Sequence, residues 1–165
     1  MKTLILITLL LIPTFAFSQT VNELFLQIPK DVLPENRTKL ITETKGDLLK
    51  FRLSEARRGE LKIFMQKKDE MLLGMAISDC DSSEIKFWII KKGVWKVVTN
   101  NVIKALGKDD VIAILKASPA TITNPNQSLD IAYFYNFFTD STNIELIARK
   151  QDSCEVAGKV YDYKF

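Results

Sequence analysis

The chain has 165 residues, with 23 basic and 20 acidic side chains and a net charge of only +3 at neutral pH. This near balance predicts no basic surface of the kind that nucleic-acid binding requires, so we expect no nucleic-acid partner. The sequence contains no histidine, which excludes Ser-His-Asp triads, Cys-His pairs and histidine metal sites.

The first eighteen residues have the features of a secretory signal peptide. Lys2 provides a positive start, an apolar run extends from Leu4 to Phe17, and Ala16-Phe17-Ser18 forms a small-x-small cleavage site. The run is short for a bilayer span and no basic flank follows it, so an uncleaved anchor is only the alternative. We therefore expect residues 1–18 to be removed and residues 19–165 to form one secreted or periplasmic domain without a transmembrane segment.

Two short helices are predicted before any strand. Val21 to Ile28 places apolar side chains on one side of a helix, with Asn22 as the predicted N-cap and Pro29 as the end. A second helix is predicted over Glu35 to Thr44, and Gly46 is placed to terminate it.

From residue 47 the apolar pattern changes to a period of two, which is typical of half-buried strands. Four such segments cover residues 49–53, 61–65, 73–77 and 85–89. A fifth short strand is predicted from Val94 to Val98. The segments between them are short and polar, so the simplest topology is an antiparallel meander.

Helical patterns return after the fifth strand. Asn100 and Asn101 are predicted to cap a helical segment through Leu106, and Asp109 is predicted to cap a second run from Asp110 to Lys116.

A loop over Ser118 to Gln127 then leads into a final group of strands. Three strands are predicted, over Ser128 to Thr139, Ile144 to Gln151 and Lys159 to Phe165. The order of helices, sheet, helices and sheet predicts one α+β domain, in which short helices precede each antiparallel meander sheet. The recurrence of this pattern hints at a helix-plus-sheet duplication.

The only two cysteines, Cys80 and Cys154, would reach a compartment where thiols oxidise. A bridge between them would close a loop of roughly 75 residues and stabilise the fold by about 4 kcal/mol in the chain-entropy model. Two unpaired structural cysteines are the alternative, because the sequence does not give the distance between their Cα atoms.

Four lysines are expected to gather at one end of the meander, because alternate turns lie at the same end of a sheet. These are Lys67, Lys68, Lys91 and Lys92, while Arg57, Arg58, Asp79 and Asp81 fall at the other end. The lysines could contact an anionic glycan or a lipid headgroup. The alternative is that they are solvated charges that protect the strand ends.

Aromatic side chains form a second candidate binding surface. Tyr133 and Tyr135 belong to a dense aromatic run that ends at Phe138, and Trp88 and Trp95 flank the turn between the last two strands of the meander. If exposed, these rings could bind a sugar or a partner protein. A central strand that is buried on both faces would explain the same run without a binding function.

The turn after the third strand of the meander contains Asp79, Asp81 and Ser83, a spacing that resembles the start of a calcium-binding loop. Glu84 and Ile90 replace the glycine and the glutamate that such a loop requires. A polar turn in which Asp and Ser side chains hydrogen-bond their own backbone is therefore favoured. We assign no metal and no cofactor to the chain.

Three features of the sequence, spread over most of its length, suggest a relationship to exported proteins. The leader is followed by Val21-Asn22-Glu23-Leu24-Phe25-Leu26-Gln27-Ile28-Pro29 with a Leu33-Pro34 step, and later by Asp79-Cys80-Asp81-Ser82-Ser83-Glu84-Ile85-Lys86-Phe87. Together they resemble a family of small exported proteins of Bacteroidetes-type bacteria that is known only as a domain of unknown function. The resemblance implies the Gram-negative envelope or exterior, and it carries over no catalytic residue.

The sequence favours a non-enzymatic binding domain, whose partner is an envelope or extracellular protein or a glycan. The aromatic-rich strands support this hypothesis, together with the lack of a catalytic motif. The alternative is a small carboxylate-dependent hydrolase of a cell-wall or glycan polymer, with Asp79, Asp81 or Glu84 as its acids.

Overall fold

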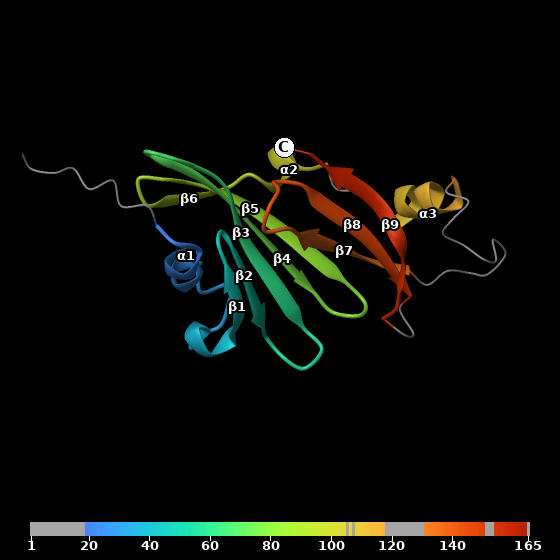
Figure 1. Cartoon of the computed structure of the whole chain (residues 1–165), viewed down its shortest axis with the longest axis horizontal. Coiled ribbons are helices and arrows are strands. Elements are labelled where there is room, and N and C mark those ends of the chain that lie inside the picture. The colour runs from blue at the N-terminus through green and yellow to red at the C-terminus, as the bar shows by residue number, and fades with distance from the viewer. Residues whose placement is uncertain (1–18, 105, 107, 118–130, 151–153, 165) are drawn as a thin grey trace, which may run out of the picture.

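The computed structural model of the protein describes residues 19–104, 106, 108–117, 131–150 and 154–164. Two antiparallel sheets pack against each other, with helix α1 (Val21–Gln27) on the outer face of the larger sheet and helix α3 (Lys108–Ala117) beside the smaller one (Figure 1). The fold is therefore largely antiparallel β, with a few short helices. Within the described ranges, no helix combines the length and the hydropathy that crossing a bilayer requires.

The larger sheet is a six-stranded meander, in which each strand pairs with the next along the chain. Its strands are β1 (Ile41–Lys45), β2 (Leu48–Arg52), β3 (Arg58–Lys67), β4 (Glu70–Ser78), β5 (Ser83–Lys91) and β6 (Val94–Val97). The predicted meander of β2 to β6 is confirmed. Short polar turns bring consecutive strands together, and alternating apolar residues bury the same face of each strand.

The predicted helix over Glu35 to Thr44 is wrong. The chain instead forms a 3₁₀ helix, η1 (Arg37–Leu40), and then the edge strand β1. Three of the first four residues of β1 are β-branched, and the strand pairs with β2, with Thr44 opposite Leu49. The β-branched side chains favour a strand, and the ladder to β2 outweighs the weak helical pattern.

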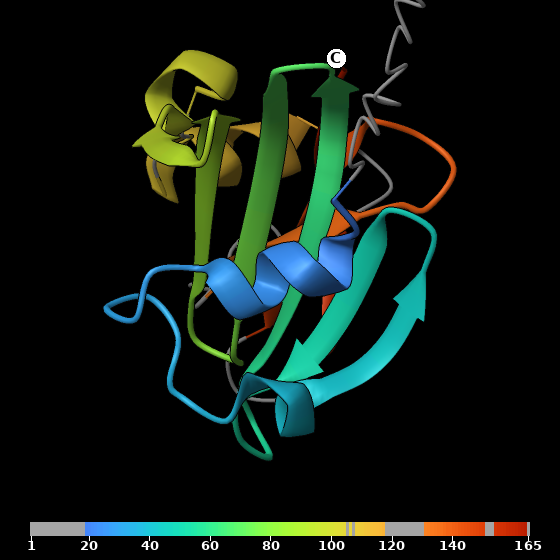
Figure 2. The same cartoon turned by 90° about the vertical axis from the view of Figure 1, so that its left-hand side faces the viewer.

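Helix α1 begins after Thr20, whose side chain forms a capping box with that of Glu23. Glu23 N donates to Thr20 Oγ1 at 3.3 Å, and Thr20 N donates to Glu23 Oε2 at 2.8 Å. The predicted cap, Asn22, lies inside the helix, because only the spacing of Thr20 and Glu23 satisfies both N–H groups. Figure 2 shows α1 crossing the outer face of the larger sheet, where Leu24 and Phe25 are completely buried.

The smaller sheet has three strands that also pair in chain order. They are β7 (Ile131–Phe137), β8 (Ile144–Lys150) and β9 (Val156–Tyr163), and they match the three predicted strands with shifted ends. The predicted loop over residues 118–127 and the predicted signal peptide over residues 1–18 lie outside the described residues.

Two helices precede the smaller sheet. The first, α2 (Thr99–Val102), begins before Asn100 and Asn101, so these predicted caps lie inside the helix. The second, α3, begins at Lys108 and has Asp109 and Asp110 in its first turn, where carboxylates interact favourably with the helix dipole.

Strand β7 is the edge of the smaller sheet, and it lies against the larger sheet. Side chains of the larger sheet accept hydrogen bonds from its outward N–H groups: Phe137 N donates to Glu60 Oε2 at 2.8 Å, and Tyr135 N donates to Ser83 Oγ at 3.5 Å. Unpaired groups at a strand edge invite pairing with another chain. These two bonds satisfy the N–H groups of Tyr135 and Phe137 and hold this part of β7 over the larger sheet.

A buried lysine connects the two sheets a second time. Lys62 of β3 is only 3% exposed, and it donates hydrogen bonds to the carbonyl oxygen of Phe138 and, at 2.7 Å, to that of Ser141. Burial lowers the pKa of its amine, while Asp47 and Asp140 act in the opposite direction. The carbonyl oxygens replace water around this charge, which makes its burial tolerable.

Candidate functional site

A cleft of about 600 Å³ lies between the two sheets. Strands β2 and β3 and the turn after β4 line one side, and β7 and β8 line the other. The charged side chains that line it are Lys50, Arg52, Glu55, Arg58, Glu60, Asp79 and Arg149. The cleft therefore differs from the two apolar cores, one of which lies between α1 and the larger sheet and the other between the two sheets.

Two arginines face each other on neighbouring strands of this cleft. Arg52 of β2 is the direct cross-strand partner of Arg58 of β3, and both side chains are exposed. Residues in such positions have Cβ atoms about 4.5–5.5 Å apart, so the two like charges repel. Neither arginine forms an ion pair with a described carboxylate.

Arg149 of β8 brings a third guanidinium to the other side of the cleft. Its Cζ atom lies 4.3 Å from the centre of the Phe134 ring, which is a cation–π contact. Its Nε is buried without a hydrogen-bond partner among the described residues. Stacking uses the face of a guanidinium and leaves the N–H donors in its plane available.

Glu60 of β3 is the carboxylate that connects the cleft to strand β7. Burial raises the pKa of this carboxyl, which outweighs the opposite effects of the hydrogen bond from Phe137 N and of Lys50 and Lys62. Between the ordinary pKa of glutamate and this raised value, the folded protein binds more protons than the unfolded chain. The contribution of Glu60 to stability is therefore present at low pH and is lost as the pH rises through the raised pKa.

We expect Glu60→Gln to remove this pH dependence. Glutamine is neutral at every pH and keeps a side-chain oxygen that can accept from Phe137 N. The free energy of unfolding of the variant, measured in urea, should therefore rise relative to wild type between pH 4 and pH 7. The control is Glu55→Gln, which removes an exposed carboxylate from the same cleft. An equal change with pH in both variants would contradict the prediction.

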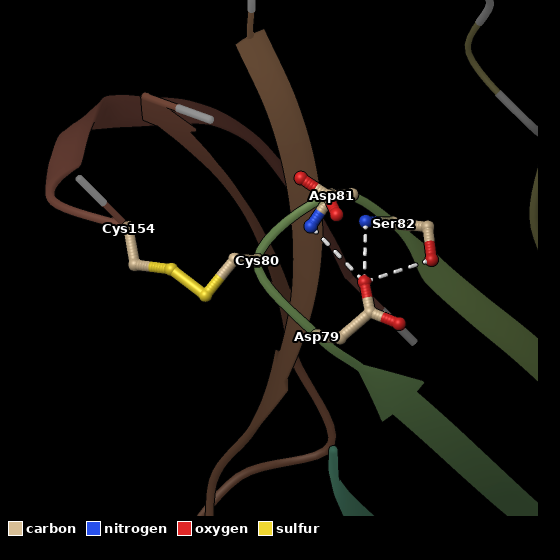
Figure 3. Close-up of a disulfide and its surroundings, with 5 residues drawn as sticks. All are labelled: Asp79, Cys80, Asp81, Ser82 and Cys154. Atoms are coloured by element: carbon tan, nitrogen blue, oxygen red, sulfur yellow. Dashed lines mark hydrogen bonds between the residues drawn. A yellow bond between two sulfur atoms is a disulfide. The ribbon is translucent and has the colours of Figure 1, made fainter. Parts of the chain in front are cut away.

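Cys80 and Cys154 form a disulfide at the edge of the cleft, with Cα atoms 5.2 Å apart (Figure 3). Cys80 lies in the turn between β4 and β5, and Cys154 lies just before β9. Of the two alternatives in the sequence, the structure thus supports the pair. The bond ties a turn of the larger sheet to the segment that leads into β9 of the smaller sheet, and both cysteines line the cleft.

Asp79 organises the turn next to this disulfide. Its Oδ1 accepts hydrogen bonds from Asp81 N at 3.0 Å, Ser82 N at 2.8 Å and Ser82 Oγ at 3.0 Å (Figure 3). Burial acts to raise the pKa of this carboxyl, but the hydrogen bonds outweigh it and hold the pKa below its usual value. This is the polar turn that the sequence favoured over a calcium loop.

Two of the four aromatic residues predicted to form a binding surface are buried in the structure. Trp88 is 2% exposed and packs in the core beneath α1, and Tyr135 is 6% exposed in the core between the sheets. So little of either ring is exposed that neither presents a face on which a ligand could stack, although Tyr135 borders the cleft. Burial also raises the pKa of the Tyr135 hydroxyl strongly.

The other two aromatic candidates are half-buried. Trp95 packs edge-to-face on Trp88 with ring centres 5.8 Å apart, and Tyr133 packs edge-to-face on Tyr135 at 6.4 Å. A binding role for Trp95 and Tyr133 stays a prediction. Each ring is anchored to a buried neighbour.

The predicted gathering of lysines at one end of the larger sheet agrees with the strand register. Lys67 and Lys91 both pair with Glu70, whose Oε2 lies 3.7 Å from Lys91 Nζ, and Lys68 and Lys92 are in the adjoining turns. All four lysines are exposed. Glu70 between two of them weakens the positive potential, and a ligand contact there stays a prediction.

No sequence pattern pointed to Arg52, Glu60 or Arg149. Arg52 alternates with apolar residues in the predicted strand 49–53, Glu60 lies just before the predicted strand 61–65, and Arg149 lies almost a hundred positions beyond Arg52 in the chain. The one available signal was the hairpin of β2 and β3, whose register places Arg52 opposite Arg58. The contribution of Arg149 depends on how the sheets pack.

The fold and the cleft define a disulfide-linked protein of two antiparallel sheets with an arginine-lined cleft between them. Comparisons with protein families, characterised proteins and solved structures found no match for the chain.

Proposed function

We propose that the chain is an exported, non-enzymatic binding domain that takes up a fragment of an extracellular glycan in the cleft between its sheets. The observation that carries this proposal is the cleft itself, whose volume of about 600 Å³ is in the usual range for small-ligand sites. A large protein partner would instead need a broad surface of low curvature. The resemblance to exported proteins and the disulfide both agree with an oxidising compartment.

The chemistry of the lining supports a ligand rich in hydroxyl groups. Thr42, Ser78 and Asn136 add uncharged polar side chains to the charged groups of the cleft. Such groups donate and accept hydrogen bonds with sugar hydroxyls, and the charged groups add stronger bonds.

A variant that fills the cleft tests this proposal. Ala56 lines the cleft and is exposed, so Ala56→Trp should obstruct the cleft without disturbing a core. We expect wild type to bind at least one class of oligosaccharide in isothermal titration calorimetry, and Ala56→Trp to bind it about tenfold more weakly or not at all. The control is Val97→Trp, an exposed position on β6 that is 58% exposed.

Binding that Ala56→Trp and Val97→Trp leave equally intact would place the ligand elsewhere and overturn the proposal. The lysine end is then the next candidate, and replacement of Lys67, Lys68, Lys91 and Lys92 by alanine would test it. A screen of neutral, uronic-acid and sulfated oligosaccharides that gives no binding would also overturn the glycan proposal.

A second candidate function is a carboxylate-dependent hydrolase, and one observation favours it. Glu60 and Asp79 line the same cleft, and their pKa values are shifted in opposite directions. Such a pair is typical of a general acid and its partner base. Of the predicted acids, Asp81 and Glu84 are instead exposed outside the cleft lining. Release of reducing ends from a bound glycan that is lost in both Glu60→Gln and Asp79→Asn would establish this alternative.

We also propose that the two groups of short helices and strands are related by duplication. Each sheet is a meander that follows helices in the chain, which supports the proposal.

A further inference from the structure

Three arginines line the cleft, and none of them forms an ion pair with a carboxylate in the described part of the chain. Glu60 accepts a hydrogen bond from Phe137 N, and Asp79 accepts three from the turn that follows it. Lys50 also lines the cleft, and its Nζ forms an ion pair with Glu43 Oε2 at 3.5 Å. Glu55 remains as an exposed carboxylate in the loop between β2 and β3.

The direct pairing of Arg52 with Arg58 is the strongest indication that the cleft binds an anion. Two like charges in such positions destabilise a hairpin, unless a group of opposite charge lies between them. An oxyanion in this position would accept from both guanidinium groups and remove the repulsion. Arginine suits this task because its planar fork matches the oxygens of carboxylates, sulfates and phosphates.

Arg149 completes the arrangement from the other sheet. Its Cζ atom lies 4.3 Å from the centre of the Phe134 ring, so this contact already holds the guanidinium at the cleft wall before any ligand binds. Its Nε is buried without a partner in the described part of the chain. A buried donor without an acceptor is costly, and a bound oxyanion is a group that would supply one.

We propose that the cleft holds its ligand by an oxyanion group, a carboxylate, sulfate or phosphate, between Arg52 and Arg58 of the larger sheet and Arg149 of the smaller one. This inference rests on the proposed function, since it names the chemistry of the ligand that the same cleft takes up. The oxyanion could belong to an acidic glycan or to a small free anion, and the two sources are separated by the probes used.

The test is calorimetric titration of the full chain and of two variants, Arg52→Gln and Arg149→Gln. The probes are a uronic-acid tetrasaccharide, a sulfated tetrasaccharide, a neutral tetrasaccharide and inorganic phosphate. We expect at least one acidic probe to bind wild type, and each variant to bind it about tenfold more weakly or worse. The control is Arg57→Gln, which removes the same charge next to Arg58 at a position that does not line the cleft; its affinity should stay within about twofold of wild type.

Thermal unfolding gives a second readout that does not depend on the glycan. Without added anion, Arg52→Gln should raise the Tm, because it removes the repulsion from Arg58. Phosphate or the acidic probe should raise the Tm of wild type and of Arg57→Gln by more than that of Arg52→Gln or Arg149→Gln.

The outcomes distinguish this inference from the proposed function. Phosphate binding that needs Arg52 and Arg149, without binding of any oligosaccharide, would support the oxyanion site and overturn the glycan proposal. Equal binding of neutral and acidic tetrasaccharides, blocked by Ala56→Trp but unchanged in both arginine variants, would support the glycan proposal and overturn the oxyanion site. Anions that stabilise all variants equally, or none, would also overturn it.

Discussion

Replacing Arg37 with methionine is expected to lower the free energy of unfolding by about 3–5 kcal/mol. Arg37 is 7% exposed, and its guanidinium lies beneath the end of α1. It donates hydrogen bonds to six main-chain carbonyl oxygens, those of Phe25, Leu26, Ile28, Pro29, Leu33 and Pro34.

The physical reason is that the last carbonyl groups of a helix have no partner within the helix. Arg37 supplies donors to these carbonyls and to the loop that follows, so one side chain holds the segment between α1 and η1. Methionine keeps much of the buried volume but has no donor, and it would leave several carbonyl oxygens buried without partners.

Urea unfolding followed by tryptophan fluorescence measures this effect, since Trp88 lies in the core that α1 covers. The control is Lys39→Met, which removes an exposed positive charge from the same 3₁₀ helix and should cost less than about 0.5 kcal/mol. Arg37→Lys should lie closer to Arg37→Met than to wild type, because one ammonium cannot replace a guanidinium fork. A loss below about 1 kcal/mol in Arg37→Met would contradict the role of Arg37 described above.

Removal of the disulfide is expected to be comparably large. The bond joins residues separated by 74 positions, for which the chain-entropy model gives about 4 kcal/mol. For a chain of this size, we expect a fall in Tm of roughly 10 °C in the double variant Cys80→Ala/Cys154→Ala. Removal of the bond should also weaken the folded state itself, because the bond ties the β4–β5 turn to the smaller sheet.

Thermal unfolding with and without a thiol reductant provides the measurement and its control. Reductant should lower the Tm of wild type toward that of the double variant and leave the double variant unchanged. A wild-type Tm that does not respond to reductant, while mass spectrometry shows that both thiols are free, would contradict the prediction.

The strands of the larger sheet were predictable because their information is local. Alternating apolar residues mark the two faces of β2 to β5, and the short polar turns between them leave antiparallel pairing as the simplest outcome. β1 was missed for the opposite reason. Only one residue of β1 is partly buried and the others are exposed, so the sequence of β1 shows no alternating hydrophobic face. Its pairing with β2 is what makes this segment a strand.

The candidate site was much less predictable. Trp88 and Tyr135 were binding candidates because they are aromatic, but their burial depends on α1 and on the packing of β7 over the larger sheet. Arg37 gave no signal, since a charged residue next to a short helix is normally solvated. Its burial follows from the chain folding back over the end of α1.

The amino-acid pattern was sufficient for the antiparallel meander, the approximate location of α3 and the chemical options left by the absence of histidine, because these follow from neighbours a few residues apart. The pairing of Cys80 with Cys154, and the position of Arg149 in the lining of the same cleft as Arg52 and Arg58, needed the packed structure. Both bring together segments that are far apart in the chain. Their distances follow from how two sheets pack across a shared core, which no local periodicity encodes.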